Sequence, residues 1–121
     1  MDRQELARRG EDAAAAFLER VGMTVVERNW RCPAGEADIV ALDGEDLVIV
    51  EVKTRRSARA GTPEESVTPS KQRRISRVAR AYVASRGLSP QRVRFDVVTL
   101  RVLSEDRALL RHLRDAFTVE G

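Results

Sequence analysis

The spacing of hydrophobic residues along the chain predicts two helices. The segment 3–21 carries apolar residues near a helical period, and Gly22 offers a C-terminal stop. A second helix is predicted to follow Thr68 as its cap, with Pro69 in the first position, and to end at Gly87. The apolar stripes comprise Leu6, Ala13, Ala14, Phe17 and Val21 in the first helix and Ile75, Val78, Ala79, Tyr82 and Val83 in the second.

Between the two helices, compact β-branched segments predict three strands, over 23–30, 36–42 and 47–53. The sequence CPAG separates the first strand from the second, and DGED separates the second from the third. Both are turn-forming sequences, so the three strands are expected to form consecutive hairpins.

The remaining segments are less uniform in pattern. Residues 54–66 have no apolar period and contain Gly61 and Pro63, so they are expected to form an exposed loop. The segment 93–100 predicts a fourth strand, whereas 108–117 fits either a strand or a helix. This order of elements indicates an α/β fold with a mixed central sheet flanked by helices.

Length and composition add few constraints. A chain of 121 residues suits one domain, expected here to span 1–121, and its net charge of +3 permits a polyanionic partner without requiring one. Cys32 is the only cysteine and His112 the only histidine, which excludes an internal disulfide and a Cys/His zinc site. The charged, alanine-rich N-terminus is unlike a signal peptide, and no stretch is long enough to cross a membrane, so a cytoplasmic location without a membrane partner is expected.

The second hairpin brings two acids together. If its loop runs from Asp43 to Asp46, the register that pairs the apolar residues of the two strands also places Asp38 opposite Glu51. Directly opposed side chains have β-carbons about 5 Å apart, and opposed like charges are destabilising. One divalent cation bound by both carboxylates would remove that conflict. Lys53 projects from the same face as Glu51, where its ammonium can orient a water or stabilise charge in a transition state.

Two other arrangements fit the same residues. A tighter turn would shift the register and pair Asp38 with Ile49, which would separate the acids. Alternatively, Lys53 could be neutralised by Glu36, leaving a solvated ladder of ion pairs.

The distribution of basic residues is uneven. Of the 22 basic side chains only Lys53 and Lys71 are lysines. A lysine is a compact charge whose pKa can be lowered by burial. A catalytic role would therefore explain why position 53 has a lysine and not an arginine. Lys71 lies one turn before Ile75 and can reach past the start of the second helix toward the same place, although chance explains this lysine equally well.

The arginines cluster around the acidic hairpin. Several arginines follow the third strand and others lie in the second helix, so phosphates could be bound from both sides. For the arginines of the helix, a solvated helical face is the simpler alternative. The residues expected to bind nucleic acid are Arg55, Arg56, Arg59, Lys71, Arg73, Arg74 and Arg77.

The sequence GEADIVALDGEDLVIVEVK resembles the core of the PD-(D/E)XK nuclease superfamily. With RRGEDAAAAFL before it and RFDVV after it, the chain resembles the YraN-like bacterial proteins from about residue 8 to 117, which look like relatives of archaeal Holliday junction resolvases. The resemblance implies a restriction-endonuclease-like fold with an αβββαβ core. It also makes a strand more probable than a helix for the C-terminal segment.

Carried over residue by residue, the resemblance implies a catalytic site. Asp38 and Glu51 would bind the metal together with the carbonyl of Val52, Lys53 would be the catalytic lysine, and Glu11 would be an additional acid and metal ligand. The cation would be Mg²⁺ or Mn²⁺, since oxygen ligands select hard cations. Two departures are Ala37, where the superfamily pattern has proline, and Ser76, which leaves the helix motif that begins at Gln72 incomplete.

The expected function is therefore metal-dependent hydrolysis of DNA phosphodiester bonds, with branched or recombination-intermediate DNA as the substrate implied by the resemblance. Related nucleases often act as dimers, so a homodimer is compatible with this function. One alternative is a non-catalytic nucleic-acid-binding module that keeps the fold. Another is an interaction protein with no nucleic-acid role, whose basic surface only aids solubility.

Overall fold

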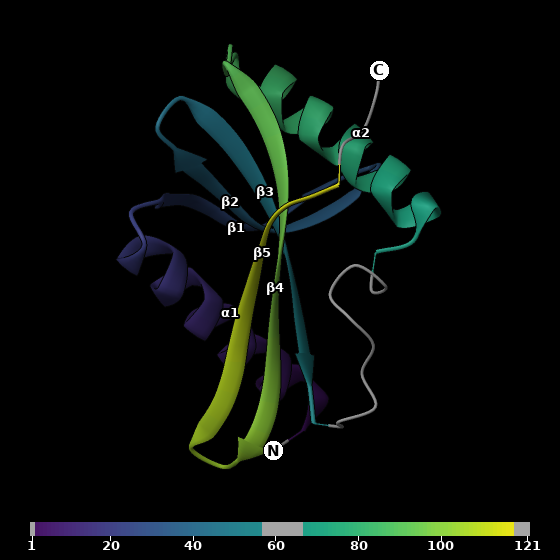
Figure 1. Cartoon of the computed structure of the whole chain (residues 1–121). Coiled ribbons are helices and arrows are strands. Elements are labelled where there is room, and N and C mark those ends of the chain that lie inside the picture. Colours follow the sequence, from purple (N-terminus) through teal and green to yellow (C-terminus); the bar gives the residue numbers. More distant parts are fainter. Residues whose placement is uncertain (1, 57–66, 118–121) are drawn as a thin grey trace.

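The computed structural model describes residues 2–56 and 67–117 (Figure 1). Helix α1 spans Arg3–Arg20 and helix α2 spans Pro69–Arg86. The strands are β1 (Thr24–Cys32), β2 (Gly35–Asp43), β3 (Asp46–Arg55), β4 (Arg92–Ser104) and β5 (Arg107–Phe117). None of the described helices is long and apolar enough to cross a membrane.

The five strands form one mixed sheet in the order β1-β2-β3-β4-β5. All neighbouring strands are antiparallel except β3 and β4, which are parallel and are joined through α2. The predicted α/β fold is confirmed, and the arrangement is compatible with a restriction-endonuclease-like core to which β5 adds an edge strand. The C-terminal segment is a strand, so the helical alternative for 108–117 was wrong.

The loop predicted over 54–66 begins too early. Thr54 and Arg55 continue β3, because β4 supplies backbone partners for both in a parallel ladder. Residues 57–66 of that prediction, which include Arg59, lie outside the described part of the chain.

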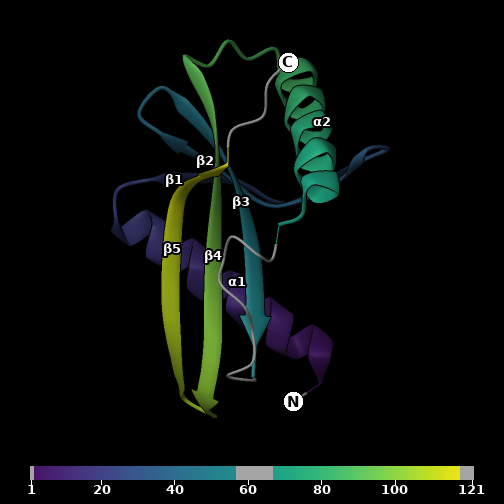
Figure 2. The same ribbon diagram turned by 45° about the vertical axis from the view of Figure 1, so that its right-hand side comes forward.

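The two helices cover opposite faces of the sheet (Figures 1 and 2). Beneath α1, buried residues such as Leu18, Ile39 and Val98 form one core cluster. Beneath α2, residues such as Val78, Ile49 and Val97 form the other. Trp30 packs edge-on against Tyr82 with ring centroids 5.1 Å apart, so both rings belong to the packing beneath α2.

The helix ends follow the predicted capping chemistry. The side chain of Thr68 accepts a hydrogen bond from the backbone of Lys71, and Gly87 adopts the left-handed conformation that ends α2. The buried stripe of α1 differs from the predicted one. It consists of Gly10, Ala14 and Leu18, whereas Val21 is 48% exposed.

A charged network fixes the edge of the sheet on the α1 side. Asp96, 1% exposed, accepts hydrogen bonds from Arg94 and from the backbone of Asp115, and its carboxylate lies 2.7 Å from Nε2 of His112. Arg94 also donates to Asp43 at the end of β2. Burial alone would raise the pKa of Asp96, but the hydrogen bonds from His112 and Arg94 lower it. The network therefore ties β2, β4 and β5 together with ionised groups.

We expect Asp96→Ala to lower the free energy of unfolding by roughly 3–5 kcal/mol at neutral pH, because it leaves Arg94 buried without its main partner. The exposed Asp106, at the β4–β5 turn, is the control, and Asp106→Ala should change stability by less than about 0.5 kcal/mol. Urea unfolding monitored by circular dichroism measures both values. Equal stability of the two variants would show that the network contributes nothing.

Candidate active site

The β2–β3 hairpin has the register predicted from its apolar residues. Leu42 pairs with Leu47 and Ile39 with Val50, so the alternative of a shifted register is wrong. The ladder ends there, and Asp38 and Glu51 would be the next pair. Instead of continuing the ladder, the backbone N–H of Val52 donates to Oδ2 of Asp38 at 2.8 Å. A side chain thus replaces a backbone partner at the point where the two acids approach.

The path of β2 changes direction at Asp38. Ala37 belongs to the core cluster beneath α2, whereas Ile39 belongs to the one beneath α1. In a regular strand, residues two apart share a face. The backbone therefore twists between these residues, which explains why the ladder stops and why the Asp38 carboxylate can turn toward β3.

Lys53 is paired with Glu51 and not with Glu36. Its Nζ lies 3.2 Å from Oε1 of Glu51, and the two side chains are 22% and 20% exposed. Glu36 instead lies 3.6 Å from Nε of Arg31. Of the two partners considered for Lys53, the structure thus selects Glu51.

Asp38 is held in conditions that oppose its ionisation. Burial and the neighbouring charge of Glu51 raise the pKa of Asp38 to about 7, and the hydrogen bond from Val52 only partly offsets them. The charges of Glu11 and Glu36 act in the same direction. An acid of this kind favours either a bound proton or a nearby cation at neutral pH.

Glu11 reaches the acidic pair from α1, on the opposite side of the sheet from α2. Burial raises the pKa of Glu11, while a hydrogen bond with Asn29 and the charge of Arg28, 3.9 Å away, oppose that shift. We call Glu11, Asp38, Glu51 and Lys53 the carboxylate–lysine site. A hollow of about 300 Å³ opens beside it, lined by Arg3, Leu6, Ala7, Glu11, Val52 and Thr54.

A close approach of α1 to β3 places Glu11. Gly10 is buried, and a β-carbon built on it would lie 2.0 Å from Oγ1 of Thr54, far inside normal contact distance. Only glycine allows the helix to pass this near the strand. Because Glu11 follows Gly10 directly, the same contact sets how far the acid reaches toward Asp38.

Two contributors were not predicted as members of the site. Glu36 adds its charge to both Asp38 and Glu11, and Asn29 hydrogen-bonds Glu11 from a left-handed conformation with φ of 53°. Glu36 could have been found from its position two residues before Asp38. Asn29 gave no sequence signal, since its place depends on the irregular register of β1 against β2.

The structure places Lys71 beside the site. The ammonium of Lys53 lowers the pKa of Lys71, burial adds to that effect, and Glu51 opposes it. The start of α2 therefore brings a second lysine close to Lys53, as its spacing predicted. Arg55 and Arg56 are exposed at the end of β3, and Arg73 and Arg77 are exposed on α2.

Arg74 has a packing contact. Its aliphatic carbons lie 3.3 Å from the position of a β-carbon on Gly35, so its stem covers the β1–β2 turn. The roles of these basic residues in binding stay predictions.

The donors fit a hard divalent cation in kind and in charge. Asp38 and Glu51 supply oxygens, and burial together with the charge of Glu51 raises the pKa of Asp38, so a cation beside Asp38 would favour its ionised form. Among the described residues, no group of three or more His, Cys, Asp and Glu side chains is placed to hold a metal. Mg²⁺ commonly uses only one or two carboxylates and completes its shell with waters and substrate phosphates, so two carboxylates are sufficient for a cation of this type.

The fold and the site together define a mixed α/β protein whose acids and lysines gather at the carboxyl end of β3. Residues 10–100, which include the whole carboxylate–lysine site, match the uncharacterised protein family UPF0102, and the chain belongs to that family. It is 50% identical over 109 residues to a UPF0102 protein of Geobacter sulfurreducens, covering 90% of this chain and 85% of the relative.

Other relatives are similarly close. A UPF0102 protein of Rhodococcus jostii is 47% identical over 93% of this chain and 95% of its own length. One from Moorella thermoacetica is 48% identical over 88% of this chain and 89% of its own length. The similarity thus extends over nearly the full length of the compared proteins.

We expect Gly10→Ala to destabilise the protein by roughly 1–3 kcal/mol, because the added methyl group would overlap Thr54. Without that overlap, the same change in a helix would stabilise by up to about 1 kcal/mol, so the sign is diagnostic. Thr54→Ala removes the overlapping oxygen and should recover part of the loss in the double variant. Thermal unfolding of the single and double variants tests this, and a stabilised Gly10→Ala would contradict it.

We expect Asp38→Asn to stabilise the metal-free protein at pH 8 by roughly 1–3 kcal/mol. The folded pKa of about 7 lies above the ordinary value of 3.8, so ionisation of Asp38 destabilises the fold progressively as the pH rises between these values. Asparagine keeps an oxygen for the N–H of Val52 and removes the charge. The gain should shrink to about 0.5 kcal/mol near pH 4, where the folded carboxyl is protonated and the unfolded one is only about half ionised.

Urea unfolding in EDTA at the two pH values measures this difference, with the exposed Glu45→Gln as the charge-matched control. A gain of the same size at both pH values, or no gain at pH 8, would show that the charge of Asp38 does not oppose folding.

Proposed function

We propose that this chain is a metal-dependent endonuclease of the PD-(D/E)XK superfamily that hydrolyses DNA phosphodiester bonds. The observation that supports this proposal most is the pair of mutually repelling carboxylates, Asp38 and Glu51, with Lys53 ion-paired to Glu51. Branched or recombination-intermediate DNA is the proposed substrate, by resemblance to junction resolvases. A homodimer would supply two such sites for two strands.

Asp38 and Glu51, with the carbonyl of Val52, would hold Mg²⁺ or Mn²⁺, and Glu11 would contribute a further acid. Such a cation supplies polarisation of a phosphoryl oxygen and a lowered pKa for a bound water. In the overall reaction a water oxygen forms a bond to phosphorus, one ester P–O bond breaks, and a proton ends on the departing oxygen.

The side chains suit this reaction in distinct ways. Lys53 is fixed by Glu51, so its remaining N–H donors can orient the water or stabilise charge on the phosphoryl oxygens. Glu11, whose pKa is raised by burial, can accept a proton more readily than an exposed acid. Lys71 adds a positive charge beside Lys53, which would favour a phosphate over a neutral ligand.

One observation favours a second candidate function. Asp38 already accepts a hydrogen bond from Val52, and Glu51 already has Lys53, so these two carboxylates have protein partners without a metal. A nucleic-acid-binding module that keeps the fold without catalysis would have the same contacts. Cleavage assays separate the two functions.

We expect the wild type to cut labelled DNA in the presence of Mg²⁺ or Mn²⁺, and Lys53→Ala to reduce the rate by about 10²–10³-fold, the loss typical of removing one stabilising donor. Duplex, single-stranded, flapped and four-way-junction DNA should be compared, with junction DNA cut fastest. Lys53→Arg is the matched control: it retains the charge but not the compact ammonium, so it should be impaired as well.

Equal cutting by wild type and Lys53→Ala would remove Lys53 from the mechanism and indicate a contaminating nuclease. If neither protein cuts but both bind DNA, the binding module becomes the better description.

A further inference from the structure

Two rows of residues cross β3, β4 and β5 next to the carboxylate–lysine site. In the first row Lys53 pairs with Thr99, and Thr99 pairs with Arg111. In the second row Arg55 pairs with Arg101, and Arg101 pairs with Leu109. The sheet register therefore continues the basic residues of β3 outward to the edge strand β5. No sequence pattern indicated that these residues are neighbours.

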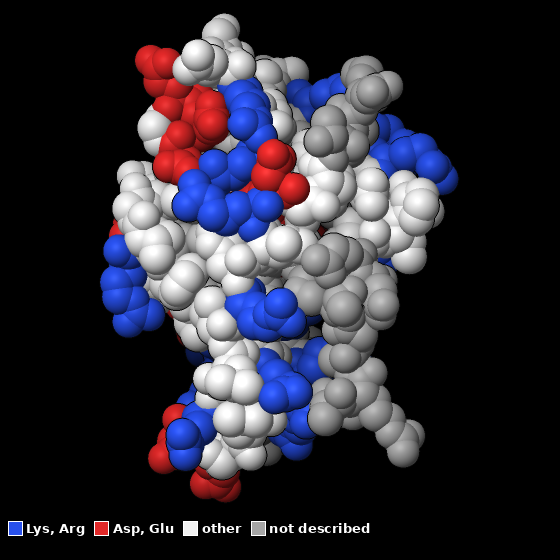
Figure 3. All heavy atoms as spheres, in the orientation of Figure 1, with Lys and Arg blue, Asp and Glu red and all other residues white. Residues whose placement is uncertain are grey.

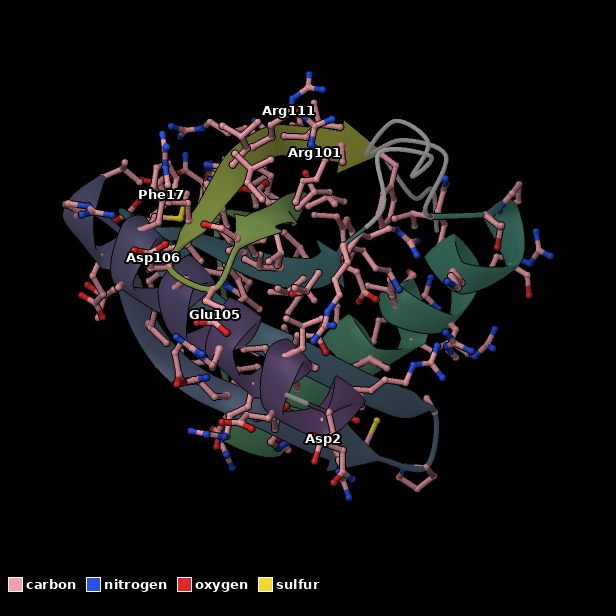
Figure 4. The ribbon with its side chains drawn as sticks, turned by 90° about the horizontal axis from the view of Figure 1, so that it is seen from below. Asp2, Phe17, Arg101, Glu105, Asp106 and Arg111 are labelled. Atoms are coloured by element: carbon pink, nitrogen blue, oxygen red, sulfur yellow. The ribbon has the colours of Figure 1, made fainter. Side chains whose placement is uncertain are left out.

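The two added arginines share the face of Lys53. Val97 lies in the core beneath α2, and side chains two and four residues along β4 point the same way, which includes Arg101. Leu113 packs against the same core, so Arg111 on β5 lies on this face as well. Figure 4 shows Arg101 and Arg111 close together on the side of the sheet away from α1.

This part of the sheet is open among the described residues. Helix α2 covers the upper half of the face, whereas the lower parts of β4 and β5 extend below it (Figure 1). Arg101 on β4, and Arg111 and the 48%-exposed Leu109 on β5, belong to these strands near their connecting turn. Figure 3 shows basic side chains over this lower region, whereas the acidic groups visible on this face gather at the upper left and the lower left of the molecule. The acids Glu105 and Asp106 lie at the β4–β5 turn (Figure 4).

Other arginines of these strands have different surroundings. Arg92, Arg94 and Arg114 each form ion pairs with aspartates. Neither Arg101 nor Arg111 has an ion pair with any residue in 2–56 or 67–117. Folding therefore leaves these two guanidinium groups available to a ligand from outside the described chain.

We propose that Arg101 and Arg111, together with Arg55, form a phosphate-binding track that leads a nucleic-acid strand away from the carboxylate–lysine site. This inference rests on the proposed function. Neighbouring strands are about 4.8 Å apart, so two strand spacings separate Lys53 from Arg111 by about 10 Å between backbones. Long arginine side chains can grip successive phosphates over that span.

The chemistry of the face selects nucleic acid over other anions. Each guanidinium can hold a phosphate through two parallel hydrogen bonds. The track begins at a site suited to phosphodiester hydrolysis, so one strand can occupy both. Leu109 lies directly beside Arg101 in the second row and offers an apolar contact to a sugar or base.

The test is binding of a labelled four-way junction and a labelled single strand in EDTA, measured by fluorescence anisotropy at several salt concentrations. Arg101→Gln/Arg111→Gln should bind about 10-fold more weakly at low salt. The slope of log affinity against log salt should fall by about 1.4–1.8 in magnitude, because each lost phosphate contact contributes about 0.7–0.9.

The control is Arg8→Gln/Arg20→Gln, which removes the same charge from α1 on the other side of the sheet. It should bind as the wild type does, within about two-fold. Arg101→Lys/Arg111→Lys retains the charge and should recover most of the salt dependence. Unchanged unfolding temperatures establish that each variant is folded.

Binding in EDTA does not depend on cleavage, so the two proposals can fail separately. Wild-type affinity and slope in Arg101→Gln/Arg111→Gln would overturn the track even if Lys53 proves essential for cutting. Loss of binding in that variant, with no DNA cleavage by any of the proteins, would support the track and contradict the proposed hydrolysis. Binding of polyglutamate with no binding of either DNA would overturn the nucleic-acid occupant.

Discussion

The site depends on holding two half-buried acids together at the end of a hairpin. The apolar residues of β2 and β3 fix a register that carries Asp38 toward Glu51, although like charges repel more strongly away from water. The fold tolerates this because Asp38 gains the backbone N–H of Val52 and Glu51 gains Lys53. Core packing thus supplies the energy that keeps an electrostatically unfavourable pair in place, as is common where chemistry requires a perturbed acid.

Sequence patterns were sufficient for the hairpin and for the helix boundaries. Leu42 could be matched with Leu47, and Ile39 with Val50, because a shifted register would break the pairing of apolar residues on both faces of the hairpin. The place of α1 was harder to predict, since its closest contact uses Gly10, which carries no hydrophobic signal. The packing role of such a glycine can be recognised only once the strand that the helix contacts is known.

Interactions between distant residues account for most of what the sequence could not show. Asp96 is ion-paired with Arg94 along β4, but its contact with His112 on β5 comes from strand pairing that the sequence left undecided. Glu36 and Asn29 join the site through the same kind of cross-strand placement. Lys71 could be anticipated because one helical turn relates it to the buried stripe.

The Asp96 network lies on one face of β4 and β5, while Arg101 and Arg111 lie on the other. Alternation along a strand thus separates the residues that maintain the edge of the sheet from those that meet the surroundings. Substitutions on the outer face leave the internal ion pairs untouched. Surface charge on these strands can therefore be changed without disturbing the ion pairs that hold the edge of the sheet, so binding preference and stability are separable in this fold.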